Sequence, residues 1–406
     1  MRATSMSEQI EIKGYLRGDG RKGVRNIILV AYLVECAHHV AHEIAYPFRD
    51  NNVHLIGFSG CNSNDYAHKM MKQICRHPNV GAVLIVSLGC ESFDRSSLED
   101  VIRSSQRPVE TLIIQHKGGT LESIRQGKDW VEKTLDMIKD TPRVSMGLNE
   151  LIVGTTCGGS DATSGITANP AIGKCFDLLI NHHATAIFEE SGELIGCEQV
   201  MADRAKTPEL AQQIINAMEK TVRYYSVLGQ GSFSVGNAEG GLTTQEEKSL
   251  GAYSKSGVSE ISGLIKPGDI PPREGLYLLD VVPDGEVRFG FPNINDTAEI
   301  AELIACGSHL ILFSTGRGSV VGSAIAPVIK ICANPETYHR MSGDMDIDAG
   351  RILEGDAGLD QVGKDIFDKV IAVAKGEKTV SENLGHQEFV LTYKRFEPIS
   401  PACLPV

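Results

Sequence analysis

Short apolar runs, each ending in a polar and often glycine-rich loop, constrain the fold of this chain most strongly. The run at residues 81–88 is apolar almost throughout, which is typical of a strand buried on both faces of a parallel sheet. Helical patterns separate it from similar runs at residues 27–32, 53–58, 109–114, 151–154, 184–188, 275–282 and 309–313. This alternation predicts an α/β fold made of two Rossmann-like, doubly wound parallel-sheet units.

A break in the pattern near residues 141–143 predicts a domain boundary. A proline and an arginine lie there, and a second series of strands and helices starts at Leu151. We therefore expect an N-terminal tail at residues 1–13, a first α/β domain at 14–145 and a second α/β domain at 146–406. A length of 406 residues fits two such domains.

Composition excludes two classes of partner and indicates a compartment. The formal net charge is −13, so the chain has no basic surplus with which to neutralise nucleic-acid phosphates. The sequence contains no stretch of about 18 apolar residues, which is the length that a membrane-spanning helix requires. The ten cysteines are scattered without a CxxC pair, and no apolar signal segment follows the N-terminus. This usage predicts reduced thiols and a cytoplasmic location.

The loop at residues 155–170 is the richest candidate for a binding site. Gly158 and Gly159 allow backbone N–H groups to approach a ligand, and Ser160 and Ser164 add hydroxyl donors. The helix expected at residues 171–180 would favour an anion at its N-terminus. The alternative is an ordinary tight connection from a strand to a helix with a Ser/Thr cap.

Two further groups of residues suggest ligand binding from their type alone. The basic entry at residues 11–26 contains Arg17 and Arg21, whose planar guanidinium groups suit a carboxylate, although such a run is also typical of a solvated loop. Asp344, Asp346 and Asp348 alternate and would suit a hard cation, although a turn or a helix cap explains them equally well.

Three cysteines each follow a strand and adjoin a glycine, namely Cys61, Cys90 and Cys157. If the fold brought them together, they would bind an iron–sulfur cluster with one open iron. Their spacing fits no standard cluster motif, and buried cysteines more often serve as small hydrophobic residues. We therefore keep both interpretations open.

The loops together resemble the altronate/galactarate dehydratase family of sugar-acid dehydratases, from about Gly14 to Phe389. The similarity lies in segments spread over the whole chain: Gly14–Arg17 with Asp19–Arg21, Ser87–Glu91, Cys157–Asp161 with Ser164–Pro170, Gly240–Thr244 with Glu247–Gly251, Thr315–Gly318, and Asp344–Asp346 with Ala349–Gly350. Single-chain members carry a small N-terminal domain of the SAF type, and no counterpart precedes Gly14. The resemblance therefore implies a separate small SAF-domain subunit, within a homo- or hetero-oligomer.

The resemblance implies loss of water from a 2,3-dihydroxy sugar acid such as altronate or galactarate, giving a 2-keto-3-deoxy acid. It implies Fe²⁺ or another divalent metal as cofactor, rather than an iron–sulfur cluster, with Cys61, Cys90 and Cys157 as candidate ligands. The candidate catalytic residues are Cys90, Glu91, Asp161, Glu189 and Glu193. The candidate substrate-binding residues are Arg17, Arg21, Gly158, Gly159, Ser160, Ser164, Thr243, Thr244, Thr315 and Arg317, with Arg317 as the clamp for the carboxylate.

Two alternatives remain from the sequence. The family also contains sulfolactate sulfo-lyases, which eliminate sulfite by the same enolising chemistry. That branch departs from the family pattern at Cys157–Asp161 and Thr315–Gly318, both of which this chain keeps. The other alternative is a non-catalytic scaffold that binds a small acid and acts only with a SAF-type partner.

Overall fold

The computed structural model describes residues 10–228, 235–284, 295–392 and 394. Within them the chain forms two parallel sheets flanked by helices, so the predicted α/β class is confirmed. Most of the predicted N-terminal tail, at residues 1–9, lies outside the described residues. Among the described helices, none combines the length and apolarity that a membrane crossing requires.

The first unit is built on a four-stranded parallel sheet in the order β4-β3-β5-β6. All eight residues of β5 are buried, as the apolar run predicts. Helices α1 and α4 pack on one face, and α2 and α3 pack on the other. The elements are β3 (Ile27–Tyr32), β4 (Val53–Gly57), β5 (Val80–Ser87), β6 (Val109–Ile113), α1 (His38–Ala45), α2 (Asp65–Cys75), α3 (Arg95–Ser104) and α4 (Thr120–Ile138).

The second unit is built on a seven-stranded sheet in the order β10-β11-β9-β8-β12-β13-β14, and every pairing in it is parallel. The sequence pattern missed β10, β13 and β14. The strands are β8 (Ile152–Cys157), β9 (Thr185–Phe188), β10 (Ile261–Ile265), β11 (Gly275–Leu279), β12 (Leu310–Thr315), β13 (Val328–Cys332) and β14 (Ile347–Asp348).

The helices of the second unit cover its sheet unequally. One face packs on α5, α7 and α13, whereas the other packs on α10 and, beyond it, on α2 of the first unit. The helices are α5 (Ala168–Asn181), α6 (Glu198–Ala202), α7 (Pro208–Leu228), α8 (Val235–Glu239), α9 (Gln245–Ser254), α10 (Asp296–Ala305), α11 (Pro335–Arg340), α12 (Arg351–Glu354), α13 (Leu359–Ala374) and α14 (Val380–Leu384). The two units therefore share one apolar core through α10.

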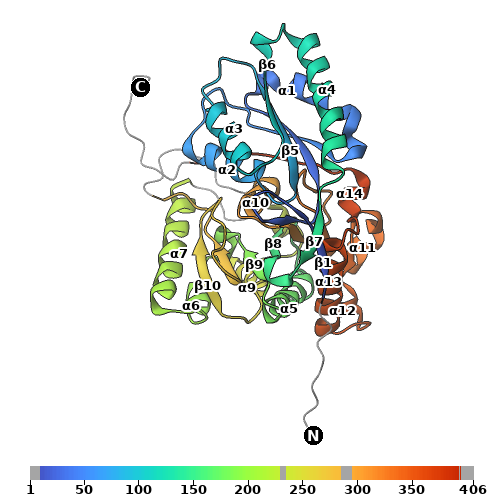
Figure 1. Ribbon diagram of the computed structural model, residues 1–406. Coiled ribbons are helices and arrows are strands. Elements are labelled where there is room, and N and C mark those ends of the chain that lie inside the picture. The colour runs from blue at the N-terminus through green and yellow to red at the C-terminus, as the bar shows by residue number, and fades with distance from the viewer. Residues whose placement is uncertain (1–9, 229–234, 285–294, 393, 395–406) are drawn as a thin grey trace.

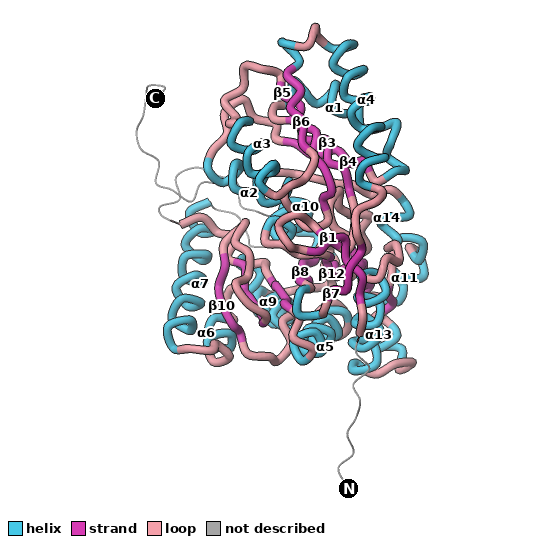
Figure 2. Tube along the Cα trace, viewed as in Figure 1, coloured by secondary structure: helices cyan, strands magenta, loops and turns pink. Residues whose placement is uncertain are grey.

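A small antiparallel sheet, absent from the sequence prediction, links the two units. The predicted basic loop at residues 11–26 contains β1 (Ile12–Leu16) and β2 (Lys22–Gly23), and β1 also pairs with β7 (Arg143–Met146). Figures 1 and 2 show β1 and β7 side by side between the first unit, at the top, and the second unit, below. Strand β1 extends across the predicted limit at residue 13, and β7 extends across the predicted limit at residue 145. The predicted domain limits stay a prediction.

Short 3-10 helices complete the described chain, and η5 lies in the segment after β9 that contributes to the site below. They are η1 (Glu35–Ala37), η2 (Tyr46–Asn51), η3 (Ile114–His116), η4 (Leu148–Glu150), η5 (Ser191–Leu194) and η6 (Ser342–Asp344).

Candidate active site

The candidate active site lies at the carboxyl edge of the seven-stranded sheet, where the strand order reverses. Strands added after β8 extend the sheet through β9 on one side and through β12 on the other. Ligands of open α/β sheets bind at such a switch point. Two backbone hydrogen bonds join the loops here, because the carbonyl of Gly159 accepts from the N–H groups of Gly316 (3.1 Å) and Arg317 (2.8 Å). Gly159 has φ +62°, which a glycine adopts without strain.

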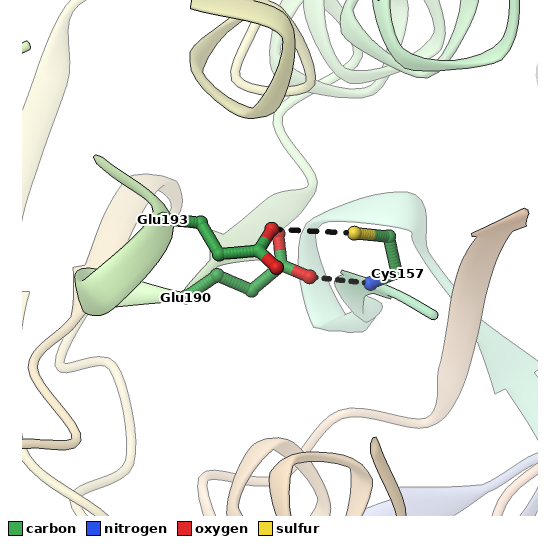
Figure 3. Close-up of side chains that lie close together, drawn as sticks. All are labelled: Cys157, Glu190 and Glu193. Carbon is green, nitrogen blue, oxygen red and sulfur yellow. Dashed lines mark hydrogen bonds between the residues drawn. The ribbon is translucent and has the colours of Figure 1, made fainter. Parts of the chain in front are cut away.

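Three potential metal ligands meet at this edge. Cys157 ends β8, whereas Glu190 and Glu193 lie in the segment after β9, and one ligand atom from each lies within 4.8 Å of the others. Glu190 accepts a 2.6 Å hydrogen bond from the Cys157 N–H, and the Cys157 thiol donates to Glu193 over 3.4 Å, as Figure 3 shows. Glu190 has φ +81°, an unusual backbone for a residue with a side chain, and such strain is typical of functional sites.

Helix α9 brings two lysines into this group. The Lys248 ammonium donates to Glu193 (2.7 Å), to the hydroxyl of Ser160 (2.8 Å) and to the sulfur of Cys157 (3.4 Å). Lys255, two turns further along and just past the helix, pairs with Glu190. All these charged side chains except that of Glu193 are less than 4% exposed, so each ammonium compensates a carboxylate that would otherwise be buried at great cost.

The electrostatics differ between the members of this group. Burial raises the pKa of the Cys157 thiol, and the charges of Glu190 and Glu193 add to the effect, so the thiol stays protonated. Burial also raises the pKa of Glu193 despite the opposing Lys248. For Glu190, burial acts in the same direction, but Lys255 and Lys248 outweigh it and lower the pKa. Glu190 is therefore the firmly ionised carboxylate of the pair.

Helix α10 contributes two more acids to the same cavity. Asp296 and Glu299 are three residues apart and therefore share a helix face. Burial raises the pKa of Asp296 to about 6, with Glu193 and Glu190 contributing. Burial also raises the pKa of Glu299 well above its usual value, and Glu189 and Glu190 add to that shift. Both carboxyl groups therefore keep their protons to a higher pH than exposed carboxyl groups do.

The predicted residue Glu189 lies behind these groups. Its carboxylate is fully buried, and neither oxygen has a hydrogen-bond partner. Burial raises its pKa well above the usual value, and Glu302 and Glu190 add to that effect. An unpartnered carboxylate in such surroundings is protonated and neutral.

The donor set fits a divalent metal of intermediate softness. One cysteine sulfur with two carboxylates suits Fe²⁺ or Zn²⁺ better than Mg²⁺ or Ca²⁺, which prefer oxygen alone. The Lys248 ammonium already lies within hydrogen-bond distance of two of the three ligands. A metal ion bound by this triad would therefore require Lys248 to move away, and the Cys157 thiol would have to lose its proton.

The enclosed space at the site is small. It measures about 50 Å³ and is lined by Cys157, Gly158, Gly159, Ser160, Glu190, Ser191, Gly192, Glu193, Tyr225, Asn237, Lys248, Val281, Asp296 and Glu299. A hollow of about 660 Å³ lies elsewhere, between α1 and the segment at residues 382–389. The group of Cys157, Lys248 and the neighbouring carboxylates does not line that larger hollow. The larger volume is therefore no reason to place the active site there.

Five residues predicted from the sequence line this cavity, and other predicted residues make hydrogen bonds in the loops around it. Asp161 accepts from the amide of Asn334 (2.8 Å) and from Thr163, and the hydroxyl of Thr315 accepts from the N–H of Gly318 (2.9 Å). Thr244 caps α9, so it positions Lys248 indirectly. The predicted residues that line the cavity are Cys157, Gly158, Gly159, Ser160 and Glu193.

The two remaining loop residues, Ser164 and Thr243, also make local contacts. The Ser164 hydroxyl accepts from the Asp161 N–H at 3.0 Å, whereas Thr243 donates to Glu247 near the start of α9. Arg317 lies at the exposed rim, where its guanidinium contacts the Gly236 carbonyl and Glu239. The predicted carboxylate clamp is therefore close to the site but engaged with α8.

Other predicted residues lie in the first unit. Arg17 is buried and donates to backbone carbonyls of Arg25 and Pro78, and Arg21 pairs with Asp19. Glu91 accepts from Ser87 and from the Gly89 N–H, which ties the loop after β5. Cys61 and Cys90 are exposed and follow β4 and β5. Among the described residues, neither belongs to a group spaced for a single metal ion together with Cys157.

The aspartates at residues 344–348 serve the backbone in this structure. Asp346 accepts from the N–H groups of Lys330 (2.9 Å) and Val380 (3.0 Å), and Asp348 accepts from that of Gly350 (2.9 Å). These contacts match the turn-and-cap interpretation that the sequence left open.

Sequence reasoning missed five of the functional candidates: Lys248, Lys255, Glu190, Asp296 and Glu299. The signal for the lysines was their spacing of seven residues on one helix, which aligns them on a single face. The two acids on α10 had the same kind of signal, a spacing of three. Burial shifts the pKa values of these side chains, and no local sequence pattern reveals which side chains are buried.

Comparison with known proteins gives the family. A model of the second domain of D-galactarate dehydratase/altronate hydrolase matches residues 14–139, and a model of the C-terminal domain of D-galactarate/altronate dehydratase matches residues 148–396. The chain therefore belongs to the D-galactarate/altronate dehydratase family, as the sequence motifs predicted.

Three relatives illustrate the range of the family. The chain is 31% identical to the (2R)-sulfolactate sulfo-lyase subunit beta of Chromohalobacter salexigens, over 93% of this chain and 96% of that one. It is 30% identical to altronate dehydratase of Escherichia coli, over 94% of this chain and 77% of the relative. It is 33% identical to galactarate dehydratase (L-threo-forming) of Escherichia coli, over 78% and 61% respectively. By name these relatives are lyases, and this chain is an enzyme of the same kind.

Proposed function

We propose that this member of the D-galactarate/altronate dehydratase family is a hydro-lyase that removes water from a 2,3-dihydroxy sugar acid such as altronate or galactarate. One observation carries the proposal: Asp296 and Glu299 share a helix face and line the same cavity, where burial raises the pKa of both carboxyl groups. Two such carboxyl groups in one cavity can supply the base and the acid of an elimination.

The chemistry needs a base, an acid and positive charge. The C2 proton of a hydroxy acid is weakly acidic, so its removal requires a base and a cation near the carboxylate. In the proposed reaction Asp296 accepts the C2 proton. Glu299 donates its proton to the C3 hydroxyl, which leaves as water. The resulting enol then tautomerises to the 2-keto-3-deoxy acid.

Lys248 supplies the fixed positive charge of the site. Burial lowers the pKa of its ammonium, but Cys157, Glu193 and Glu190 outweigh burial and raise it, so Lys248 stays charged. A charged group held in place before the reaction stabilises developing negative charge without reorganisation. A divalent metal such as Fe²⁺, held by Cys157, Glu190 and Glu193, would supply Lewis-acid stabilisation of the enolised carboxylate in place of Lys248, which would have to move away.

Substrate entry requires the site to widen. Pockets that bind small molecules usually measure about 300–1,000 Å³, whereas the cavity here measures about 50 Å³. Asn237 of α8 lines it, and Arg317 at the rim contacts α8. Release of Arg317 from Glu239 would both open this rim and free the guanidinium to bind a substrate carboxylate.

A second candidate is elimination of sulfite from a sulfonated hydroxy acid. The observation that favours it is coverage, because this chain spans 96% of the sulfo-lyase subunit beta but 77% of the altronate dehydratase. The word subunit in that relative's name also favours a companion chain, and we propose a small SAF-type subunit in that role. Cytoplasmic location stays a prediction.

The test is anaerobic turnover of a panel of aldonates, aldarates and 3-sulfolactate, with Fe²⁺ or Zn²⁺ and with or without a small subunit. We expect 2-keto acid from a sugar acid without sulfite, and loss of that product in Asp296→Asn and Glu299→Gln. Sulfite release would replace the proposal with the sulfo-lyase candidate. No turnover on any substrate would contradict both and favour an acid-binding scaffold. Full activity of Arg317→Ala would remove the clamp assignment.

A further inference from the structure

Three free, exposed cysteines lie at the carboxyl edge of the first sheet. Cys36 follows β3, Cys61 follows β4 and Cys90 follows β5, and these three strands are adjacent in the order β4-β3-β5. The sequence motifs singled out Cys61 and Cys90 but not Cys36. This edge belongs to a different sheet from the candidate active site.

Backbone hydrogen bonds gather the three loops around the end of the central strand β3. The Glu35 N–H, next to Cys36, donates to the Ser59 carbonyl in the loop after β4 (3.2 Å). The Ser92 N–H, in the loop after β5, donates to the Cys61 carbonyl (2.9 Å). The loops that carry Cys61 and Cys90 are therefore in direct contact, and the loop that carries Cys36 touches the first of them.

Exposure of three thiols in one place calls for a chemical reason. Free cysteines are usually buried, and an exposed thiol is open to oxidation. The other six cysteines among the described residues follow the usual pattern and are buried: Cys75, Cys157, Cys175, Cys197, Cys306 and Cys332.

Among the described residues, these cysteines form no site for a single metal ion. No group that includes these cysteines has three ligand atoms within 4.8 Å of one another in the described part of the chain. A single ion such as Zn²⁺ needs ligands gathered that closely around one point. A cluster does not, because each thiolate binds a different iron and the ligands stand further apart.

We propose that Cys36, Cys61 and Cys90 bind a [4Fe–4S] cluster through three of its irons, which leaves the fourth iron open toward solvent. Each thiol loses one proton when its sulfur binds iron, and two Fe²⁺, two Fe³⁺ and four sulfide ions together supply a [4Fe–4S]²⁺ cluster without a further oxidant or reductant. Cys157, which the sequence grouped with Cys61 and Cys90, is excluded from this centre because it ends β8 and contacts Glu193 and Lys248. The proposal is independent of the proposed hydro-lyase chemistry.

The test is anaerobic reconstitution of the purified full chain with iron and sulfide. The readouts are acid-labile sulfide per chain, visible absorbance and the electron paramagnetic resonance signal after reduction. Acid-labile sulfide counts only clusters, so a mononuclear iron at Cys157 does not interfere. The variants are Cys36→Ser, Cys61→Ser and Cys90→Ser, and Cys157→Ser is the matched control.

We expect about four sulfides per chain in the wild type and in Cys157→Ser, and less than about a tenth of that in each of the other variants. Absence of sulfide in the wild type would overturn the proposal, as would zinc binding in its place. Retention by Cys36→Ser together with loss in Cys157→Ser would restore the grouping from the sequence instead.

Thiol labelling of the wild type keeps the test decisive if a serine variant does not fold. Iodoacetamide should modify Cys36, Cys61 and Cys90 in the cluster-free chain, and the loaded chain should protect all three together. Mass spectrometry after digestion locates the labelled residues. Equal labelling of the loaded and cluster-free chains would contradict the proposal.

Discussion

The carboxyl edges of the two parallel sheets have the same architecture but opposite chemistry. At the edge of the seven-stranded sheet, Glu190, Lys248 and Lys255 are buried charges paired with one another. At the edge of the four-stranded sheet, Cys36, Cys61 and Cys90 are exposed. Both edges are loops after buried strands, and sequence patterns treat them alike.

The difference comes from what covers each edge. Helix α9 and the segment after β9 enclose the edge of the second unit, so its carboxylates lose water and their pKa values shift. The thiols of the first unit keep contact with solvent and stay open to an external reagent. In both sheets the strand end places a side chain at the carboxyl edge. The elements that cover this edge decide whether the side chain is buried, with a shifted pKa suited to proton transfer, or exposed and able to bind an external ligand.

The largest expected effect tests the buried pairing itself. Glu190→Gln leaves the buried Lys255 ammonium without its partner, so the free energy of unfolding should fall by about 3–5 kcal/mol in urea denaturation. The matched control is Glu122→Gln, which breaks an exposed ion pair on α4 and should leave stability unchanged. Recovery of stability in the double variant with Lys255→Met would attribute the loss to the unpaired charge. Equal stability of wild type and Glu190→Gln would show that the buried ion pair does not contribute to stability, which would contradict the contrast drawn between the buried edge and the exposed edge.

The next effect concerns the charge of the site. Lys248→Met should lower kcat by about 100- to 1000-fold, because a fixed cation no longer faces the developing negative charge. It should also tighten binding of Fe²⁺ or Zn²⁺, measured by calorimetry, because no ammonium competes for Glu193 and Cys157. Lys174→Met, which alters an exposed pair on α5, is the control. Unchanged metal affinity in Lys248→Met would argue that the metal does not bind to Cys157, Glu190 and Glu193.

A smaller effect is pH dependence through Asp296. Because a base must be ionised, kcat/KM should rise with pH and level off above a midpoint near the pKa of about 6. Below that pKa, the loss should be about tenfold per pH unit. The pKa of folded Asp296 lies above the ordinary aspartate value of 3.8, so the stabilising contribution of the protonated carboxyl is present at low pH and is lost as pH rises through about 6. Asp296→Asn should abolish both the kinetic limb and this change in stability. A wild-type profile without a limb near this pH would exclude Asp296 as the base.

The smallest effect is expected at the exposed edge. In cluster-free protein, Cys61→Ser should change the free energy of unfolding by less than about 0.5 kcal/mol, because the side chain is exposed. Cys157→Ser should cost about 1–3 kcal/mol, since its sulfur lies in a buried hydrogen-bond network. Thermal and urea melts of the two variants compare them directly. Similar losses in both would show that the first edge is packed more tightly than its exposure indicates.

Much of this molecule was predictable from local patterns, and the errors share a cause. The strands β3, β5, β8 and β12 appear as apolar runs, and the α/β class follows from their alternation with helices. The pairing of β1 with β7 was missed because it joins residues more than a hundred positions apart. Short-range periodicity carries no information about such a partner.

The sequence by itself determined the fold class, the family and the loop from Cys157 to Ser160, because these depend on apolar periodicity and on contiguous motifs. Only the tertiary structure decided which charges meet. It brought Lys248 to Cys157 and Glu193, placed Asp296 and Glu299 in the same cavity as these residues, and placed Cys36 rather than Cys157 on the same sheet edge as Cys61 and Cys90. The physical reason is that a charge or a thiol acquires its reactivity from burial and from neighbours in space, and chain order specifies neither.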